Sequence, residues 1–152
     1  MKAKKFINKI LSIVLCFGLI VAFVPQSIAV DTETEGSLSA VIDTGREITL
    51  YDKDNDTYYE IWNADQLYAF AQIVNNGNTA LNIELLLDIT VNSNVFDSTG
   101  NLVSDTSALR SWIPIGKNGV EYQGDFDGQN HTVSGLFCND TQLEKTGLFG
   151  II

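Results

Sequence analysis

The chain has little cysteine, which limits how it can be stabilised. Of its two cysteines, Cys16 lies within an N-terminal apolar run, so Cys138 is the only one in the remainder. A single cysteine cannot form an internal disulfide, and the sequence therefore excludes a disulfide-stapled extracellular miniprotein. Stability has to come from the burial of apolar side chains and from hydrogen bonds.

Positive charge is also scarce, and much of it is concentrated at the N-terminus. Nine Lys and Arg residues stand against 19 Asp and Glu residues. Four of the basic residues but none of the acidic ones lie in the first 29 positions, so residues 30–152 hold five basic and 19 acidic residues, a net charge of −14. A surface this acidic repels the phosphates of nucleic acids and anionic lipids, which excludes nucleic acid as a partner.

The first 29 residues have the pattern of an export signal. Four lysines flank the start of an apolar run of 15 residues from Ile10 to Val24, and Ser27-Ile28-Ala29 is the small-x-small pattern that signal peptidase cleaves. We predict a cleavable signal peptide over residues 1–29, with cleavage after Ala29, and a secreted or cell-surface protein. The run is shorter than the roughly 20 residues that span a bilayer. An uncleaved membrane anchor is the alternative, but we expect that the mature chain does not span a membrane.

The mature chain is expected to begin with a leader. Residues 30–45 are rich in Thr, Glu, Ser and Asp, and we predict that they are flexible. Within them, Leu38 to Ile42 is a weak candidate for a short edge strand. We assign residues 46–152 to one folded region.

The first clear element of that region is a β-hairpin. Residues 47–51 and 58–62 are β-branched and aromatic runs, and the polar connector at 52–57 separates them.

The connector also resembles part of a calcium loop. Asp52, Asp54 and Asp56 match positions 1, 3 and 5 of an EF-hand-type loop. However, Thr57 stands where the turn needs glycine, and Asn63 stands where a bidentate Glu is needed. Because Asp and Asn are also the commonest turn residues, we interpret the connector as a solvated turn and predict no metal site.

A helix is predicted at about 63–74, followed by a strand. Asn63 is an N-cap candidate with Gln66 three residues on, and apolar residues follow at helical spacing up to Val74. Residues 81–91 then alternate between apolar and polar, with only Leu86 out of pattern, which predicts one half-buried strand. The Ser-, Thr-, Asn- and Asp-rich segment 92–111 is too long for an ordinary connection, so we expect it to carry strands of its own or to project for recognition.

Beyond residue 111 the sequence consists of short strand-like pieces and glycines. Gly-Leu recurs at Gly135-Leu136 and Gly147-Leu148, and the strand centres Ile113 and Val133 are 20 residues apart. Short strands with frequent bends and a regular period favour stacked coils, as in a parallel β-helix or solenoid.

An ordered set of pieces resembles the start of GLUG-motif proteins, which are secreted bacterial surface proteins with pectate-lyase-like (pectin lyase-like) β-helices. The pieces are residues 61–70, 74–77, 87–89, 112–116, 124–136 and 147–150. The resemblance covers residues 58–152 and implies a mainly β fold, a right-handed parallel β-helix whose open end is covered by the helix at 63–74. GLUG-containing regions also occur in adhesin-like proteins and in some immunoglobulin-cleaving peptidases. The resemblance implies no catalytic residues.

The end of the chain departs from this pattern. GLUG regions continue through several coils, but here the chain stops after the first Gly-Leu-Phe-Gly with an apolar end at residues 148–152. We therefore predict that residues 46–152 are the N-terminal cap and first coils of a β-helix truncated at its C-terminus, with further coils as a natural partner.

The stretch Gly124–Leu136 concentrates the residues most like a site. Asp125, Asp127 and His131 can be drawn as an acid–base group or a metal site. However, the nearest lysine is Lys117 and no arginine follows Arg110, so the cationic base that a lyase would use is not at hand. We interpret residues 127–130 as a turn in which Gly128 takes a positive φ. Replacing Gly128 with Val should then impair folding, whereas Asp125→Asn should be tolerated.

Two further candidate sites are interpreted as structural. Cys138 has acidic neighbours that disfavour a thiolate, so we do not expect a nucleophile. Four aromatic residues can be drawn as a sugar-stacking platform, but aromatics at strand positions more often fill the core; they are Trp62, Trp112, Tyr122 and Phe126. We predict no catalytic residues, no cofactor and no metal.

The sequence therefore predicts a non-catalytic structural or adhesive module. We expect the 92–111 loop and the coil faces to contact an extracellular glycan or a host or cell-surface protein. The alternative is that the chain is the accessory N-terminal region of a larger surface peptidase or polysaccharide-degrading enzyme.

Overall fold

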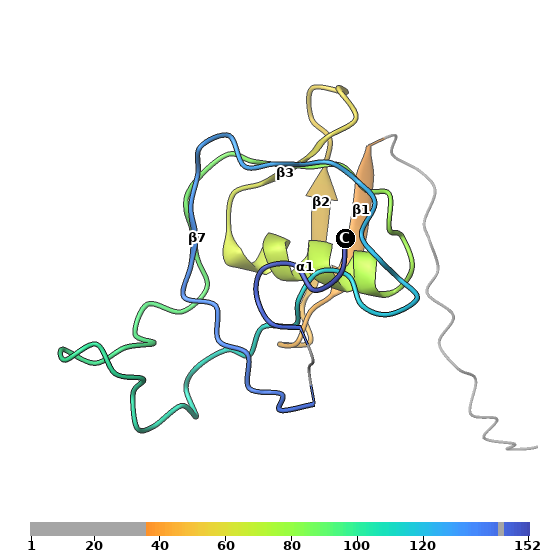
Figure 1. Cartoon of the computed structure of the whole chain (residues 1–152). Helices are drawn as coiled ribbons and strands as arrows, with labels where there is room; N and C mark the ends of the chain where they lie inside the picture. The colour runs from red at the N-terminus through yellow and green to blue at the C-terminus, as the bar shows by residue number, and fades with distance from the viewer. Residues whose placement is uncertain (1–35, 143–144) are drawn as a thin grey trace, which may run out of the picture. The chain divides into compact units, whose positions relative to one another are not determined.

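The computed structural model describes residues 36–142 and 145–152. The predicted signal peptide and its cleavage site lie outside the described residues. The elements, in chain order, are β1 (Ser37–Val41), β2 (Glu47–Tyr51), β3 (Tyr59–Ile61), α1 (Ala64–Asn75), β4 (Ile83–Leu85), β5 (Ile89–Thr90), β6 (Phe126–Asp127) and β7 (Val133–Ser134). They form one five-stranded sheet in the order β1-β2-β3-β4-β6 and a separate pair, β5-β7 (Figure 1).

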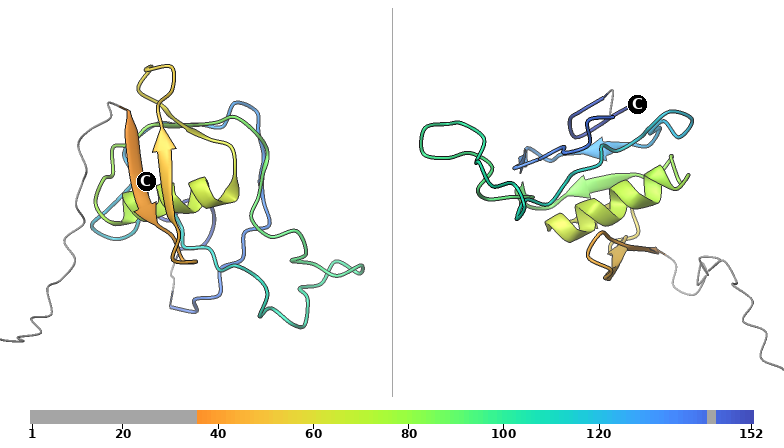
Figure 2. Two further views of the ribbon diagram at one scale, coloured as in Figure 1. Left: turned by 180° about the vertical axis from the view of Figure 1, so that it is seen from behind. Right: turned by 90° about the horizontal axis from the view of Figure 1, so that it is seen from below.

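The fold is mixed α/β, and the predicted parallel β-helix is wrong. Strands β1, β2 and β3 pair antiparallel, whereas β3, β4 and β6 pair parallel. The helix does not cover the end of a solenoid; it lies between the β1–β2 hairpin and the parallel strands (Figure 2). Short strands with regular bends are compatible with several sheet arrangements, because periodicity identifies strands without identifying their neighbours.

The helix itself is confirmed, together with its cap. The side chain of Asn63 accepts a hydrogen bond from the backbone N–H of Gln66 (3.0 Å), and the Gln66 side chain accepts one from the N–H of Trp62 (3.0 Å). The first bond satisfies one of the backbone donors that the first turn leaves without partners, and the second holds the residue that precedes the cap. The apolar stripe packs into the core, where Phe70 and Val74 are fully buried.

The predicted hairpin is also confirmed, and it gains a third strand. Strands β2 and β3 pair antiparallel with Tyr51 opposite Glu60. Five residues of the segment assigned to a flexible leader form β1, which pairs with β2 along its whole length. Residues Ser37–Val41 therefore form an edge strand, as the weak strand candidate in this segment predicts.

The predicted eleven-residue strand at 81–91 is wrong, because the chain turns a corner in its middle. Leu87 is 55% exposed, and the strands on either side of it, β4 and β5, belong to different sheets. The side chain of Asp88 fixes the corner by accepting a hydrogen bond from the N–H of Thr132 at 2.8 Å. The only departure from alternation is Leu86, next to the corner, and one apolar residue at a polar position does not by itself predict a bend.

Two glycines allow neighbouring backbone segments to approach each other closely. A Cβ on Gly124 would overlap the carbonyl oxygen of Leu81, and one on Gly135, at φ +71°, would overlap that of Asn92. Gly128, by contrast, has open space around it and no positive φ. The expectation that Gly128 supplies the left-handed conformation of its turn is therefore wrong; Gln129 (φ 43°) does so instead, followed by Asn130.

Candidate functional site

The candidate site residues of Gly124–Leu136 do not point toward a common centre. The Tyr58 hydroxyl donates a hydrogen bond to Asp125 at 2.6 Å. Asp127 accepts one from the backbone of its own turn at 2.9 Å. His131 Nδ1 lies 3.4 Å from the carboxylate of Asp88. Each side chain thus serves a different neighbour, and their arrangement supports a turn between strands.

The aromatic residues considered as a sugar platform do not form one exposed face. Phe126 is partly buried and packs edge-on against Phe149. Trp112 and Tyr122 are buried in the core, and the indole N–H of Trp112 donates to the carbonyl of Gly147 at 3.0 Å. The ring of Trp62 carries the Lys53 ammonium 3.5 Å above its centroid. No flat aromatic face for a sugar ring forms from these residues.

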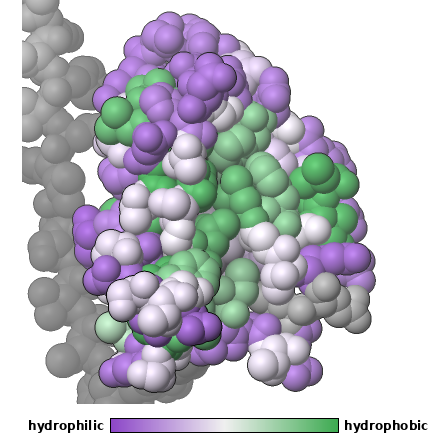
Figure 3. All heavy atoms as spheres, turned by 60° about the vertical axis from the view of Figure 1, so that its left-hand side comes forward, coloured by the Kyte–Doolittle hydropathy of each residue, from purple (hydrophilic) through white to green (hydrophobic). Residues whose placement is uncertain are grey.

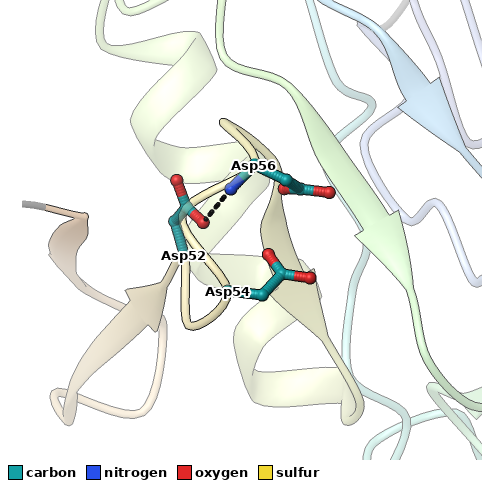
Figure 4. Close-up of side chains that lie close together, drawn as sticks. All are labelled: Asp52, Asp54 and Asp56. Atoms are coloured by element: carbon teal, nitrogen blue, oxygen red, sulfur yellow. Dashed lines mark hydrogen bonds between the residues drawn. The ribbon is translucent and has the colours of Figure 1, made fainter.

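The connector between β2 and β3 brings three carboxylates together. Oxygens of Asp52, Asp54 and Asp56 all lie within 4.8 Å of one another (Figure 4). Asp52 accepts hydrogen bonds from the N–H groups of Asp56 (3.1 Å) and Thr57 (3.0 Å). Asp56 accepts one from Tyr58 at 2.8 Å. Asp54 accepts none from the described residues.

The backbone of this connector is strained. Asn55 has φ 62° and Thr57 has φ 81°. The left-handed region is common for Asn, but it is rare for a β-branched residue such as Thr. Thr57 thus adopts the conformation for which a glycine would ordinarily be needed.

A row of carboxylates crosses the sheet beside this connector; we call it the acidic ladder. Glu60, Glu84 and Asp127 lie directly opposite one another on β3, β4 and β6, so their side chains share one face. Like charges at opposing sheet positions destabilise the pairing. Burial, followed by repulsion from Asp56, Asp54 and the two other ladder residues, raises the pKa of Glu84 above its usual value.

The 92–111 loop forms a second, separate feature with a defined base. Asn92 donates hydrogen bonds to the carbonyls of Arg110 (3.0 Å) and Gly135 (2.9 Å), and it accepts one from the N–H of Arg110 (2.7 Å). One side chain therefore joins the two ends of the loop to each other and to the neighbouring chain segment.

Arg110 ties the base of the loop to the rest of the fold. Its guanidinium binds the carboxylates of Asp43 and Asp65, and it stacks 3.4 Å above the centroid of the Tyr68 ring. The hydrogen bond from Arg110 lowers the pKa of Asp43 below its usual value. The arginine side chain is only 18% exposed, so these contacts are partly shielded from water.

The outer part of the 92–111 loop is a small hairpin with exposed apolar residues. Val103 N–H donates to the Val95 carbonyl (3.1 Å), and Phe96 pairs with Leu102 in an antiparallel bridge. Residues opposite each other in such a bridge lie on the same face. Phe96 is 67% exposed and Leu102 is 51% exposed. Figure 3 shows the side of the molecule from which the loop projects, where hydrophobic residues lie exposed among hydrophilic ones.

No helix in the described residues is long and apolar enough to cross a membrane.

The comparisons with known proteins give no family. No family model, no curated protein and no solved structure matches the chain. The resemblance to GLUG-motif proteins therefore stays a prediction that rests on the sequence pieces alone.

Proposed function

We propose that the chain is a non-catalytic, exported adhesive module that binds an extracellular protein through the 92–111 loop. The observation that carries the proposal is the pair of exposed apolar side chains, Phe96 and Leu102, on one face of the loop hairpin. Aromatic and other large apolar side chains of this kind are the usual anchors of protein interfaces, where a few residues supply most of the binding energy.

The loop is held in shape before any partner arrives. Its base is joined by the three hydrogen bonds of Asn92, and its tip is closed by Asp97, which accepts hydrogen bonds from Thr99 and Asn101. A loop that is already ordered loses less conformational entropy on binding, so more of the contact energy contributes to affinity.

A protein fits this surface better than a glycan does. Glycan sites need an aromatic face together with polar groups for the sugar hydroxyls. Here Trp112 and Tyr122 are buried, and the Lys53 ammonium lies over the ring of Trp62. The loop instead offers an apolar pair on a strongly acidic chain. A partner with an apolar pocket and a basic rim would complement both properties.

The test is a binding assay against a panel of purified extracellular-matrix proteins and a glycan array. We expect saturable binding to at least one matrix protein and none to the glycans. The double variant Phe96→Ser/Leu102→Ser should weaken that binding by about tenfold or more. Leu87→Ser is the matched control, because Leu87 is 55% exposed but lies at the β4–β5 corner, outside the loop.

Three outcomes would contradict the proposal. The first is that no matrix protein binds, and the second is that glycans bind instead. The third is that the double variant and the Leu87→Ser control bind equally well. Circular dichroism of each variant establishes that the fold is intact, so that a loss of binding is not a loss of structure.

A further inference from the structure

We propose that Asp52, Asp54 and Asp56 form a binding site for a divalent cation of the calcium class, and that Glu60 supplies a further oxygen ligand from beneath the loop. The site is independent of the 92–111 loop and of any partner that the loop binds. It replaces the solvated turn that the sequence alone favours for this connector.

The observation that separates this cluster from an ordinary acidic turn is the state of Glu60. Its side chain is 95% buried, since only 5% of the residue is exposed. One carboxylate oxygen, Oε1, accepts a hydrogen bond from the N–H of Lys53 at 3.0 Å. The other, Oε2, is buried without a hydrogen-bond partner among the described residues. A buried carboxylate oxygen without a partner is costly, and a bound cation removes that cost.

The same hydrogen bond shows where Glu60 points. Lys53 lies between Asp52 and Asp54 in the loop, so the carboxylate that its N–H contacts faces the underside of the loop. The three aspartates have oxygens within 4.8 Å of one another. Glu60 is outside that group and adjoins the loop through the N–H of Lys53. Position 9 of calcium loops often binds the cation through a water molecule, and Glu60 would reach a cation held by the aspartates in this way.

The spacing agrees with the ligand pattern of calcium loops. Counted from Asp52, the aspartates occupy positions 1, 3 and 5, and Glu60 occupies position 9, each of which supplies ligands in such loops. Thr57, at the position of the usual glycine, has the positive φ that the turn requires. Asn63, at position 12, caps the helix and is not available as a ligand. Glu60 is thus the candidate for a fourth carboxylate, in place of the Glu that usually stands at position 12 of such loops.

The cluster carries negative charge that the described residues do not neutralise. None of the ion pairs in the described part of the chain involves the three aspartates or the acidic ladder. The nearest loop cation, the ammonium of Lys53, is engaged with the ring of Trp62. Like charges this close repel one another. A divalent cation would relieve this repulsion.

The ligand chemistry favours calcium over other divalent ions. All the candidate ligands are oxygens, and no His or Cys belongs to the group, whereas zinc prefers nitrogen and sulfur. An exposed loop suits Ca²⁺, which accepts six to eight oxygens in flexible geometry, better than Mg²⁺, which demands an octahedron. Water molecules would complete the coordination. Extracellular calcium modules typically bind with dissociation constants of about 10⁻⁴ to 10⁻³ M.

The test is isothermal titration of the full chain with CaCl₂ at constant ionic strength, after removal of metal by a chelator. We expect one saturable site, weaker binding of Mg²⁺, and a rise in melting temperature with Ca²⁺. Asp54→Asn should weaken Ca²⁺ binding by about tenfold or more, because it removes a charged ligand. Asp54 accepts no hydrogen bond from the described residues, so this change leaves the turn intact.

The control variant is Glu47→Gln, which removes one negative charge from β2 outside the cluster. It should leave the dissociation constant for Ca²⁺ within about twofold of the wild-type value, because an exposed charge at a distance is screened.

Glu60→Gln should also weaken binding, and if that variant fails to fold, Asp54→Asn still decides the question. The proposal is overturned if Ca²⁺ shows no saturable binding up to about 10 mM, well above the range expected for extracellular modules. It is equally overturned if Asp54→Asn and Glu47→Gln bind Ca²⁺ alike, because the binding would then follow net charge alone.

Discussion

The two aspartate-containing loops of this protein differ in how their carboxylates are satisfied. In the 92–111 loop a single carboxylate, Asp97, accepts three hydrogen bonds from its own turn. In the Asp52–Thr57 connector three carboxylates crowd together, and Asp54 accepts no hydrogen bond from the described residues. Hydrogen bonds from its own turn therefore satisfy the carboxylate of Asp97, whereas the connector concentrates negative charge that an external cation would balance.

The loops also differ in how they are attached to the fold. The 92–111 loop is joined at its base by Asn92 and Arg110, through hydrogen bonds and partly shielded ion pairs. The Asp52–Thr57 connector lies on β2 and β3, and Glu60 contacts it from below. Changes at the base of the first loop should therefore affect overall stability, whereas changes in the second should affect cation binding.

The largest effect is expected at the base of the 92–111 loop, for Gly135→Ala. A Cβ at this position would overlap the backbone oxygen of Asn92, and the residue has φ +71°. We expect the free energy of unfolding to fall by about 3 kcal/mol, because backbone atoms cannot move aside cheaply. Chemical denaturation measures the change.

Gly128→Ala is the matched control, since Gly128 has open space for a Cβ and no positive φ. Its unfolding free energy should stay within about 0.5 kcal/mol of the wild-type value. Equal effects of the two substitutions would show that the close approach of Gly135 to Asn92 is not what holds the base of the loop.

A smaller effect is expected for Arg110→Met. The substitution removes the contacts to Asp43, Asp65 and the Tyr68 ring. Because the guanidinium is partly shielded, we expect a loss of about 2 kcal/mol. Arg46→Met removes an ion pair from a side chain that is 65% exposed, and it should cost about 0.5 kcal/mol or less. Neither variant should change the affinity for Ca²⁺; a shared change would mean that the two loops are coupled.

The smallest effects concern pH, and they should have opposite signs in the two regions. Hydrogen bonds from Thr99 and Asn101 lower the pKa of Asp97, so its contribution to stability is present above the unfolded-state pKa and is lost as the pH falls through the folded value. The pKa of Glu84 is raised, so its contribution is present below the unfolded-state pKa and is lost as the pH rises through the folded value.

At neutral pH and without metal, Glu84→Gln should therefore raise the melting temperature and Asp97→Asn should lower it, each by a small amount. The two differences from the wild type should shrink near pH 3, where both carboxyl groups are protonated in the unfolded state. Thermal unfolding monitored by circular dichroism between pH 3 and 8 measures them. A stabilising Asp97→Asn would show that its turn does not depend on the ionised carboxylate.

Local elements could be predicted from the sequence, but their assembly could not. The cap at Asn63 and the apolar stripe of α1 depend on neighbouring residues, and both are confirmed. The sheet order depends on contacts between distant segments, and the pairing of β4 with β6 joins residues more than 40 positions apart. The corner at Leu87 could not be predicted, because its only trace in the sequence is one apolar residue, Leu86, at a position that alternation assigns to a polar one.

Only part of the candidate cation site could be predicted from the sequence. The aspartate spacing indicates part of a calcium loop, but Thr57 in place of glycine argues against one, since a positive φ at a β-branched residue cannot be anticipated from sequence. Glu60 lies at position 9 of the pattern, yet its burial and its unpartnered oxygen depend on the packing of β3 between β2 and β4. The contacts of Arg110 and Asn92 at the base of the 92–111 loop could not be predicted, because their partners lie in distant segments.

The most direct test of the contrast between the two loops is a Ca²⁺ titration followed by ¹H–¹⁵N correlation spectra. We predict saturable shifts of the backbone amides of residues 52–60 and of Glu84, while the amides of residues 95–103 stay unchanged. Shifts that grow without saturation in both loops, or no shifts in the connector, would contradict the assignment of a cation site to Asp52, Asp54, Asp56 and Glu60.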